Sequence, residues 1–324
     1  MEIALMSLNL SGHYQTIYPH FFRKVPPIPS SNAPFILSDG DEISLSYDDK
    51  ERKSLVVLLH GLEGSSQSPY MQAMRQHLLQ HDFDVLAINY RCCGGKENLK
   101  NHCYHAGQTS DVLEVVQHFN RLRSYENTFL LGFSFGGNMA LKTLSSHKSE
   151  LPANLKACLA ISAPVDLRSA ALSMQKGANR IYEKRFLQSL LAKVKQKQQK
   201  FPDEVAQFDT NKVHTLYAFD DLWTAPMHGF KSADDYYHQC SALYSLAEID
   251  RPFCILNAQN DPIIGKGSIQ IRHFFRKNAI SFPPYMRLIT PKNGGHCGFQ
   301  FRRNGKKSAY HQDLAVAFFK TKGA

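Results

Sequence analysis

The sequence predicts an α/β protein in which a mostly parallel central sheet carries helices on both faces and an inserted helical cap. Three observations predict this fold. Strand-length apolar runs alternate with helix-length segments between residues 55 and 162, the alternation stops after Pro164, and it resumes at Phe253. Strands that alternate with helices form mainly parallel sheets, because each crossover returns the chain to the same end of the sheet. The interruption therefore predicts a lobe inserted into one larger domain.

The first part of the chain is expected to lie outside the sheet domain. Pro26, Pro27 and Pro29 indicate an extended linker, because proline fixes φ and lacks a backbone donor. We therefore expect an N-terminal extension over residues 1–33 and a domain over residues 34–324, with the cap at about 166–250. Two short β stretches within 35–47 surround a turn signal, and 55–59 is a continuous apolar run suited to a buried strand. A β-meander is expected to lead into the core.

The remaining elements follow from the same alternation. Helices are expected over 70–81, 109–122 and 136–145, and strands over 85–90, 128–133 and 155–162. Beyond the cap we expect strands over 253–258 and 285–290, and helices over 268–277 and 309–320.

Length and composition exclude several protein classes. Of the 324 residues, 43% are hydrophobic and 20% are charged, a composition typical of folded, water-soluble proteins. No apolar run approaches the roughly 20 residues that a membrane span requires. The net charge of +10 predicts a weak, salt-dependent attraction to anions, including peripheral contact with an anionic membrane. It indicates no specific nucleic acid and no obligate protein partner.

The cysteines give no sign of a disulfide framework. Seven cysteines lie at irregular spacings, and the N-terminus lacks a charged-then-apolar signal peptide. We therefore expect reduced thiols in a cytoplasmic protein. One loop gathers several potential metal ligands, but their spacing matches no regular zinc pattern and no nucleotide-binding fingerprint is present, so neither metal nor cofactor is expected. These ligands are Cys92, Cys93, His102, Cys103 and His105.

The predicted cap carries a basic stretch in which Lys193, Lys195, Lys197 and Lys200 are close in sequence. Such a run most often forms the solvated face of a helix. We favour that interpretation over a lipid or nucleic-acid patch.

The strongest chemical signal is Gly132-Phe133-Ser134-Phe135-Gly136, which ends an apolar strand and begins a helix. This context is typical of a nucleophile elbow, in which a serine occupies a strained turn between strand and helix. The residues on either side must be small, because strand and helix approach closely there. The alternative, a glycine-rich turn with an incidental serine, is less favoured in this context. Ser134 is therefore the candidate nucleophile.

A serine hydroxyl needs a base within hydrogen-bond reach, usually an imidazole oriented by a carboxylate. Among fifteen histidines, His296 is favoured because it follows the last predicted strand and two glycines that let its loop project. Asp261 follows the preceding strand and is the only carboxylate there. Asp166, after the strand that ends near Ser162, is the rival position. The chain order Ser, Asp, His is the one expected when the serine lies on such an elbow.

The negative charge that develops on the carbonyl oxygen needs two preorganised donors. One is the backbone N–H of Phe135, directly after the nucleophile. The other is expected from the His60-Gly61-Leu62-Glu63-Gly64 loop, after the first long parallel strand, with the amide of Leu62 as candidate.

Several motifs together resemble one known family. They include the Ser134 elbow, Ser68-Pro69-Tyr70 and the loop from His60 to Ser66. They also include 12–19 (GHYQTIYP), 104–107 (YHAG), 228–230 (HGF), 235–237 (DYY) and 294–299 (GGHCGF). Over nearly the whole chain the sequence resembles the YheT-like branch of the α/β-hydrolases, which also contains abhydrolase-domain lipases and esterases. The resemblance implies a carboxylesterase or lipase-like activity without a cofactor.

Two positions depart from what the resemblance implies. Asn260-Asp261 stands where an Asp-Asp pair is expected before the proline, which leaves Asp261 as the only carboxylate of the pair. Cys92 stands where a glycine is expected, and it places a Cβ in a loop near the site.

The sequence thus predicts a serine hydrolase that cleaves small-molecule or lipid-like carboxylic esters through an acyl-enzyme. The same three residues are also compatible with an acyltransferase, if the cap excludes water. A third reading is a non-catalytic protein that binds anionic surfaces, and the intact set of Ser134, Asp261 and His296 argues against it.

Overall fold

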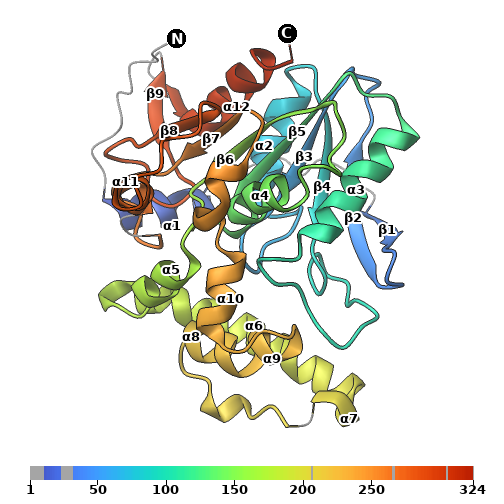
Figure 1. Cartoon of the computed structure of the whole chain (residues 1–324), viewed down its shortest axis with the longest axis vertical. Coiled ribbons are helices and arrows are strands. Elements are labelled where there is room, and N and C mark those ends of the chain that lie inside the picture. The colour runs from blue at the N-terminus through green and yellow to red at the C-terminus, as the bar shows by residue number, and fades with distance from the viewer. Residues whose placement is uncertain (1–10, 23–31, 206, 265–266, 304–305, 324) are drawn as a thin grey trace.

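The computed structural model describes residues 11–22, 32–205, 207–264, 267–303 and 306–323 (Figure 1). Its main sheet is built from β1 (Asn32–Ile36), β2 (Glu42–Asp48), β3 (Ser54–Leu59), β4 (Asp84–Asn89), β5 (Asn127–Phe133), β6 (Leu155–Ile161), β7 (Phe253–Leu256) and β8 (Met286–Ile289). The helices around it are α1 (Gly12–Phe22), α2 (Pro69–Leu79), α3 (Thr109–Leu122), α4 (Phe135–Ser146), α11 (Gly267–Lys277) and α12 (Tyr310–Lys320).

Within the described residues the strands form one sheet in the order β1-β2-β4-β3-β5-β6-β7-β8. The pairs β1–β2 and β2–β4 are antiparallel, and every later pair, from β4–β3 to β7–β8, is parallel. The predicted mostly parallel sheet is thereby confirmed. Parallel strands all end at the same edge, so the loops that follow β3, β5, β7 and β8 meet there.

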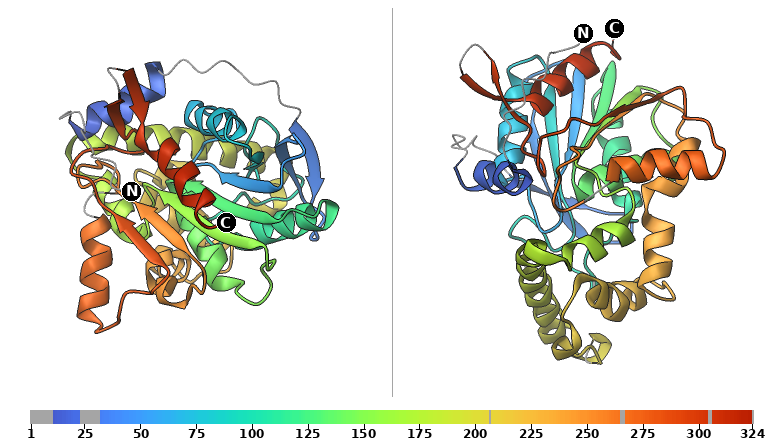
Figure 2. Two further views of the ribbon diagram at one scale, coloured as in Figure 1. Left: turned by 90° about the horizontal axis from the view of Figure 1, so that it is seen from above. Right: turned by 90° about the vertical axis from the view of Figure 1, so that its left-hand side faces the viewer.

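Both faces of the sheet are covered, as predicted. Side chains alternate along a strand, so Leu55, Val57 and Leu59 of β3 join one apolar cluster while Val56 and Leu58 join another. The first cluster includes residues of α3, α4 and α11, and the second includes residues of α2 and α12. Figure 2 shows these two helical layers on either side of the sheet. A sheet buried on both faces explains why its central strands are continuous apolar runs.

Two predictions about strands need correction. The expected meander is wrong beyond its first hairpin, because β2 pairs with β4 rather than with β3. The chain crosses over through α2 between β3 and β4, and the parallel pairing of these strands leaves β2 next to β4. A second, two-stranded sheet of β9 (Gln300–Arg303) and β10 (Lys306–Ala309) precedes α12 and was not predicted.

The segment between β6 and β7 forms the lobe below the sheet in Figure 1. Its apolar interior includes Leu187, Phe208 and Trp223, together with Ile263 and Ile264 from the loop after β7. The lobe consists of α5 (Leu167–Met174), η1 (Gly177–Asn179), α6 (Arg180–Lys200), α7 (Pro202–Val205), η2 (Thr210–Lys212), α8 (Leu216–Phe219), η3 (Asp220–Thr224), α9 (Ala225–Met227), α10 (Ala233–Cys240) and η4 (Ala242–Glu248). We call this segment the cap.

The last part of the cap returns to the body. Tyr236, Leu243 and Leu246 belong to the same apolar cluster as α3 and α4. Leu167, at the start of the cap, belongs to this cluster as well, so both ends of the cap pack against the body. None of the helices in the described ranges is both long enough and apolar enough to cross a membrane.

Candidate active site

Ser134 lies in the turn between β5 and α4, with φ of 52° and ψ of −122°. A positive φ is rare for a residue with a side chain and marks a strained turn. The N–H of Ser134 donates to the carbonyl of Ile161 at 2.8 Å, and its carbonyl accepts from Gly137 N at 2.8 Å. These bonds hold the backbone of Ser134 in place at the end of the sheet.

The glycines beside Ser134 are required by close packing. A Cβ on Gly132 would come within 2.1 Å of the Gly136 carbonyl oxygen, and one on Gly136 within 2.4 Å of the Leu59 oxygen. Neither position accepts a larger residue without moving the backbone. The strand and the helix therefore approach as closely as the sequence pattern implies.

The structure brings Ser134, His296 and Asp261 together. His296 Nε2 lies 2.8 Å from Ser134 Oγ, and His296 Nδ1 lies 2.9 Å from Asp261 Oδ2 and 3.1 Å from Oδ1. Asp261 Oδ1 also accepts from the N–H groups of Ile263 and Ile264, at 2.9 and 3.2 Å. The carboxylate side chain is fully buried. The N–H at Nδ1 thus donates to the Asp261 carboxylate, which leaves Nε2 to accept the serine proton.

The protonation of His296 is governed by two opposed effects. Burial disfavours the charged imidazolium, but the negative charge of Asp261 and its hydrogen bond outweigh burial and hold the pKa of His296 well above its usual value. The Asp261 carboxylate therefore stabilises the imidazolium that forms when His296 accepts a proton.

Three further residues hold the histidine loop, and sequence reasoning did not find them. The side-chain oxygen of Asn260 accepts from the N–H groups of Gly294 and Gly295, both at 3.0 Å. The N–H of His296 donates to Thr16 Oγ1 at 2.8 Å, and the next N–H donates to Ser162 Oγ at 2.9 Å. Thr16 belongs to α1, so part of the predicted N-terminal extension contacts the site.

Asp166, the rival position for the acid, lies elsewhere. Its side chain accepts from Ser169 N at 3.0 Å and caps the first turn of α5. The structure gives it a helix-capping role and places Asp261 beside the imidazole.

The two predicted oxyanion donors, Phe135 and Leu62, both line the pocket that contains Ser134. Phe135 is the first residue of α4, where backbone N–H groups have no partner within the helix. Leu62 lies in the loop after β3, and both residues line the same pocket as Ser134. Within the described parts of the chain, no hydrogen bond takes up either N–H.

The loop that carries Leu62 is tied to the cap through Glu63. Glu63 has φ of 55°, and its N–H donates to the hydroxyl of Tyr104 at 2.9 Å. Its carboxylate accepts from Tyr104 at 2.9 Å, from Lys193 Nζ at 2.7 Å and from the hydroxyl of Ser189. Lys193 and Ser189 both belong to α6. The position of the oxyanion loop is therefore coupled to the position of the cap.

His60 begins this loop and stays neutral. Burial lowers its pKa to about 3. Its Nδ1 lies 2.8 Å from the Gly61 oxygen, while its Nε2 accepts from Tyr90 N at 3.3 Å. A neutral imidazole with a proton on Nδ1 satisfies both contacts, so His60 acts as a support of the loop.

A small pocket of about 90 Å³ opens above Ser134, between the body and the cap. Most of its wall is apolar, and the cap supplies the larger share of the side chains. The lining residues from the body include Leu62, Tyr104, His105 and Phe135, and those from the cap include Ala171, Met174, Phe186, Leu190, Phe219, Asp220, Thr224, Tyr236 and Tyr237.

In the loop after β4, Cys92 adopts a backbone conformation typical of glycine. Cys92 has φ of 63°, a conformation that favours glycine, and it forms a disulfide with Cys103. The expectation of reduced thiols is wrong for this pair, because the loop folds back and brings the two sulfurs together. The neighbouring Arg91 is buried and pairs with Asp111 at 2.8 Å and with Asp41 at 2.9 Å. No group of three His, Cys, Asp or Glu placed to hold a metal ion occurs among the described residues.

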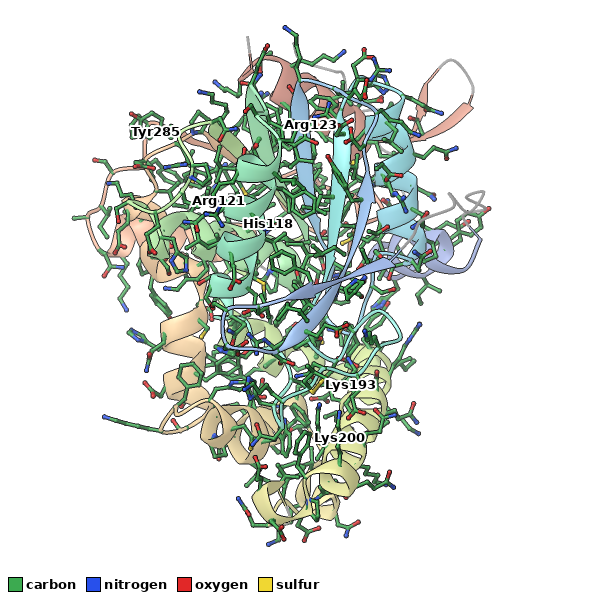
Figure 3. All side chains as sticks on the ribbon, turned by 90° about the vertical axis from the view of Figure 1, so that its right-hand side faces the viewer. His118, Arg121, Arg123, Lys193, Lys200 and Tyr285 are labelled. Carbon is green, nitrogen blue, oxygen red and sulfur yellow. A yellow bond between two sulfur atoms is a disulfide. The ribbon has the colours of Figure 1, made fainter. Side chains whose placement is uncertain are left out.

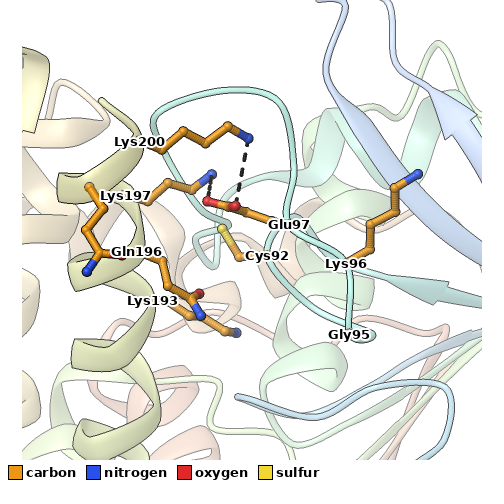
Figure 4. Close-up of a pocket in the computed structure, with 9 residues that line it drawn as sticks. Cys92, Gly95, Lys96, Glu97, Lys193, Gln196, Lys197 and Lys200 are labelled. Atoms are coloured by element: carbon orange, nitrogen blue, oxygen red, sulfur yellow. Dashed lines mark ion pairs between the residues drawn. The ribbon is translucent and has the colours of Figure 1, made fainter. Parts of the chain in front are cut away.

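The predicted solvated lysine face is wrong for part of α6. Lys197 is only 1% exposed and donates to the carbonyl of Lys100 at 2.7 Å, whereas Lys195 is exposed. Figure 4 shows Lys197 and Lys200 pointing toward Glu97 across a pocket of about 520 Å³. Both ion pairs are long, at 3.5 and 3.8 Å. This side of α6 therefore packs against the loop after β4 (Figure 3).

A family model described as the alpha/beta hydrolase fold matches residues 54–302. The chain belongs to the α/β-hydrolase family. This α/β-hydrolase is 31% identical to the YheT protein of Escherichia coli (strain K12) over 295 residues, covering 89% of this chain and 84% of YheT. The predicted YheT-like branch is thereby confirmed.

Two other similarities agree with this family. The monoacylglycerol lipase of Saccharomyces cerevisiae is 28% identical over 275 residues, which cover 82% of this chain and 59% of the lipase. Among solved structures, the esterase Pf2001 of Pyrococcus furiosus superposes on this α/β-hydrolase with a TM-score of 0.60 and 16% identity. The superposition covers 91% of this chain and 94% of the esterase chain. At that identity the superposition shows the fold alone.

Proposed function

We propose that this α/β-hydrolase cleaves carboxylic esters, with Ser134 as nucleophile, His296 as general base and Asp261 as the carboxylate that orients the imidazole. The observation that carries the proposal is the continuous set of contacts from Ser134 Oγ to His296 Nε2 at 2.8 Å and from His296 Nδ1 to Asp261 at 2.9 Å. A base in contact with a serine on a strained turn is the arrangement that activates a hydroxyl.

Hydrolysis then proceeds in two halves. Ser134 Oγ attacks the ester carbonyl as its proton passes to His296 Nε2, and the imidazolium gives that proton to the departing alcohol. The acyl group is left on Ser134. A water molecule then gives a proton to His296 and attacks the acyl-enzyme, which releases the carboxylic acid and returns the proton to Ser134 Oγ. Asp261 keeps its negative charge throughout.

The N–H groups of Phe135 and Leu62 are proposed to stabilise the oxyanion in both halves. Loss of one such donor typically costs about 2.7–4 kcal/mol of transition-state stabilisation. The support for this role is their place in the pocket that contains Ser134 and the absence of another acceptor among the described residues. The contacts of Glu63 with the cap are proposed to keep the Leu62 amide in place.

The small volume of the pocket favours a substrate whose group inside the pocket is compact. Pockets for drug-sized ligands are roughly 300–1,000 Å³, whereas the pocket above Ser134 is about 90 Å³. We propose that the cap selects short or slender ester substrates through its apolar side chains.

Hydrolysis of p-nitrophenyl acetate and p-nitrophenyl butanoate tests the proposal. Ser134→Ala and His296→Ala are expected to remove the activity, while His118→Ala, on an exposed position of α3 (Figure 3), keeps it. Release of the free acid in the presence of an added alcohol distinguishes hydrolysis from acyl transfer. Full activity of the Ser134→Ala protein would contradict the proposal.

A further inference from the structure

The pocket above Ser134 contains a carboxyl group that the proposed mechanism does not use. Asp220 lines this pocket and is partly exposed. It is nevertheless deep enough in the protein that burial raises its pKa to about 6.

The contacts of Asp220 are with neutral groups. Thr224 Oγ1 donates to Asp220 Oδ1 at 2.6 Å, and the hydroxyl of Tyr237 donates to Oδ2 at 2.7 Å. Among the described residues, no lysine, arginine or histidine lies within 4.0 Å of this carboxyl to form an ion pair. At neutral pH the negative charge of Asp220 therefore has no partner of opposite charge in the protein, which is costly for a group out of bulk water.

The backbone at Asp220 is also unusual. Asp220–Thr224 forms one turn of π-helix between α8 and α9. Such turns are rare and occur often at functional sites. Here the turn places two polar side chains, those of Asp220 and Thr224, on a mainly apolar pocket wall.

The rest of the pocket wall suits a cation. Aromatic rings attract a positive charge placed over their faces, by about 0.5–2 kcal/mol. His105, the only histidine of this wall in the described chain, has a pKa lowered by burial to about 4, so it carries no opposing charge at neutral pH. The aromatic residues of the wall are Phe135, Phe186, Phe219, Tyr236 and Tyr237, together with Tyr104, whose ring already has Lys193 Nζ 5.4 Å from its centre.

We propose that this pocket binds a substrate that carries a positively charged ammonium group, with the charge held by Asp220 and the surrounding aromatic rings. This inference deepens the proposed function and rests on it for one point, that the bound cation is a substrate. The binding of the cation itself does not depend on that function. A neutral hydroxyl-bearing chain is the competing occupant, because a carboxylate also accepts a hydrogen bond from an alcohol.

Binding to the Ser134→Ala protein separates the two occupants without requiring catalysis. Protonated n-alkylamines of two to six carbons are titrated by calorimetry beside 1-alkanols with the same number of heavy atoms. At one or more chain lengths the ammonium ion is expected to bind at least tenfold more tightly than its matched alcohol. Equal binding of the two series would overturn the proposal in favour of the neutral occupant, and no binding of either series would overturn it altogether.

Variants at Asp220 and its neighbours test the assignment to this carboxyl. Asp220→Asn keeps the size of the side chain and is expected to abolish the preference for the ammonium ion. Asp221→Asn, which removes the adjacent exposed carboxylate, is expected to keep it. Circular dichroism checks that each variant is folded. A preference that survives in folded Asp220→Asn protein would place the cation elsewhere.

Activity of the wild-type chain separates this inference from the proposed function. p-Nitrophenyl 3-aminopropanoate and p-nitrophenyl butanoate differ by an ammonium in place of a methyl group. The kcat/KM of each ester is divided by its rate constant for alkaline hydrolysis, which corrects for intrinsic reactivity. The corrected kcat/KM is expected to be at least tenfold higher for the amino ester. Hydrolysis of both with equal kcat/KM overturns the inference and leaves the esterase intact, whereas hydrolysis of neither overturns the proposed function.

Discussion

Replacement of Asp220 by asparagine changes the pH dependence of stability in a direction that the structure defines. The folded-state pKa of Asp220 is raised by burial to about 6, from an ordinary value of 3.8. Between these two values the folded protein binds more protons at this site than the unfolded chain, so the free energy of unfolding falls as pH rises. The loss is complete about one unit above pH 6. Asparagine does not titrate, so Asp220→Asn lacks this loss.

The size of the effect follows from the same two pKa values. Linkage gives a loss of about 2 kcal/mol from wild-type stability between pH 4.5 and pH 8 at this one site. Other groups titrate equally in both proteins and cancel in the difference. The stability of Asp220→Asn relative to wild type is therefore expected to improve by about 2 kcal/mol over this range.

Urea unfolding at pH 4.5, 5.5, 6.5 and 8 measures this difference, since the extrapolated free energy of unfolding is obtained at each pH. Asp221→Asn is measured beside it as the matched control, because it removes the adjacent, exposed carboxylate. A difference for Asp220→Asn that stays flat between pH 4.5 and pH 8 would refute the reasoning. The charge of Asp220 would then have a compensating partner.

Three further predictions follow from other contacts. Because Asp261 raises the pKa of His296, the acid limb of the pH profile of kcat/KM is expected above pH 6.5. In Asp261→Asn this limb should move to lower pH, and kcat should fall by up to about 10⁴-fold. An acid limb that does not move would contradict the pairing of Asp261 with His296. Lys193→Met removes the ionic one of the two contacts of Glu63 with α6 and leaves the hydrogen bond from Ser189. It is expected to lower kcat about tenfold with little change in KM, while Lys195→Met leaves both unchanged. Equal rates in the two variants would contradict the coupling of loop and cap. Cys103→Ser should reduce the free energy of unfolding by about 2–4 kcal/mol without reductant and by little when reductant is present. Adding Cys92→Gly to this variant should restore about 1 kcal/mol, because Cys92 has a positive φ. Equal free energies of unfolding for the single and the double variant in urea would argue against backbone strain at Cys92.

The elements that the sequence predicts well are those whose signal is local. The helix expected over 109–122 is α3, with the same limits, and the strand over 128–133 is β5 with one residue added. Their apolar periodicity arises from burial on one or both faces, which is a property of each segment alone. The same locality explains Ser134, since the elbow is a strand, a turn and a helix in direct succession.

The pairing of strands is less readily predicted. Whether β2 pairs with β3 or β4 depends on how α2 crosses over, and the local pattern of β2 is the same in either case. The β9–β10 hairpin was missed because its strands are short and polar, with Gln300, Arg302 and Lys306 among eight residues. Such strands lack the alternation that identifies a buried sheet.

The supporting residues of the candidate site lie far from it in sequence. Thr16 and Ser162 hold the histidine loop from 280 and 135 residues away, and no spacing rule connects them. The Cys92–Cys103 disulfide and the buried Lys197 depend in the same way on how the loop after β4 folds back. Only Asn260, next to Asp261, gave a sequence signal, in its departure from an Asp-Asp pair.

Labelling with an active-site fluorophosphonate, followed by peptide mapping, tests the central claim most directly, because it detects an activated serine without any knowledge of the substrate. Stoichiometric label on the peptide that contains Ser134, absent from folded Ser134→Ala and His296→Ala proteins, is the result that the proposed mechanism predicts. A folded wild-type protein that takes up no label, or takes it up equally in Ser134→Ala, would contradict it.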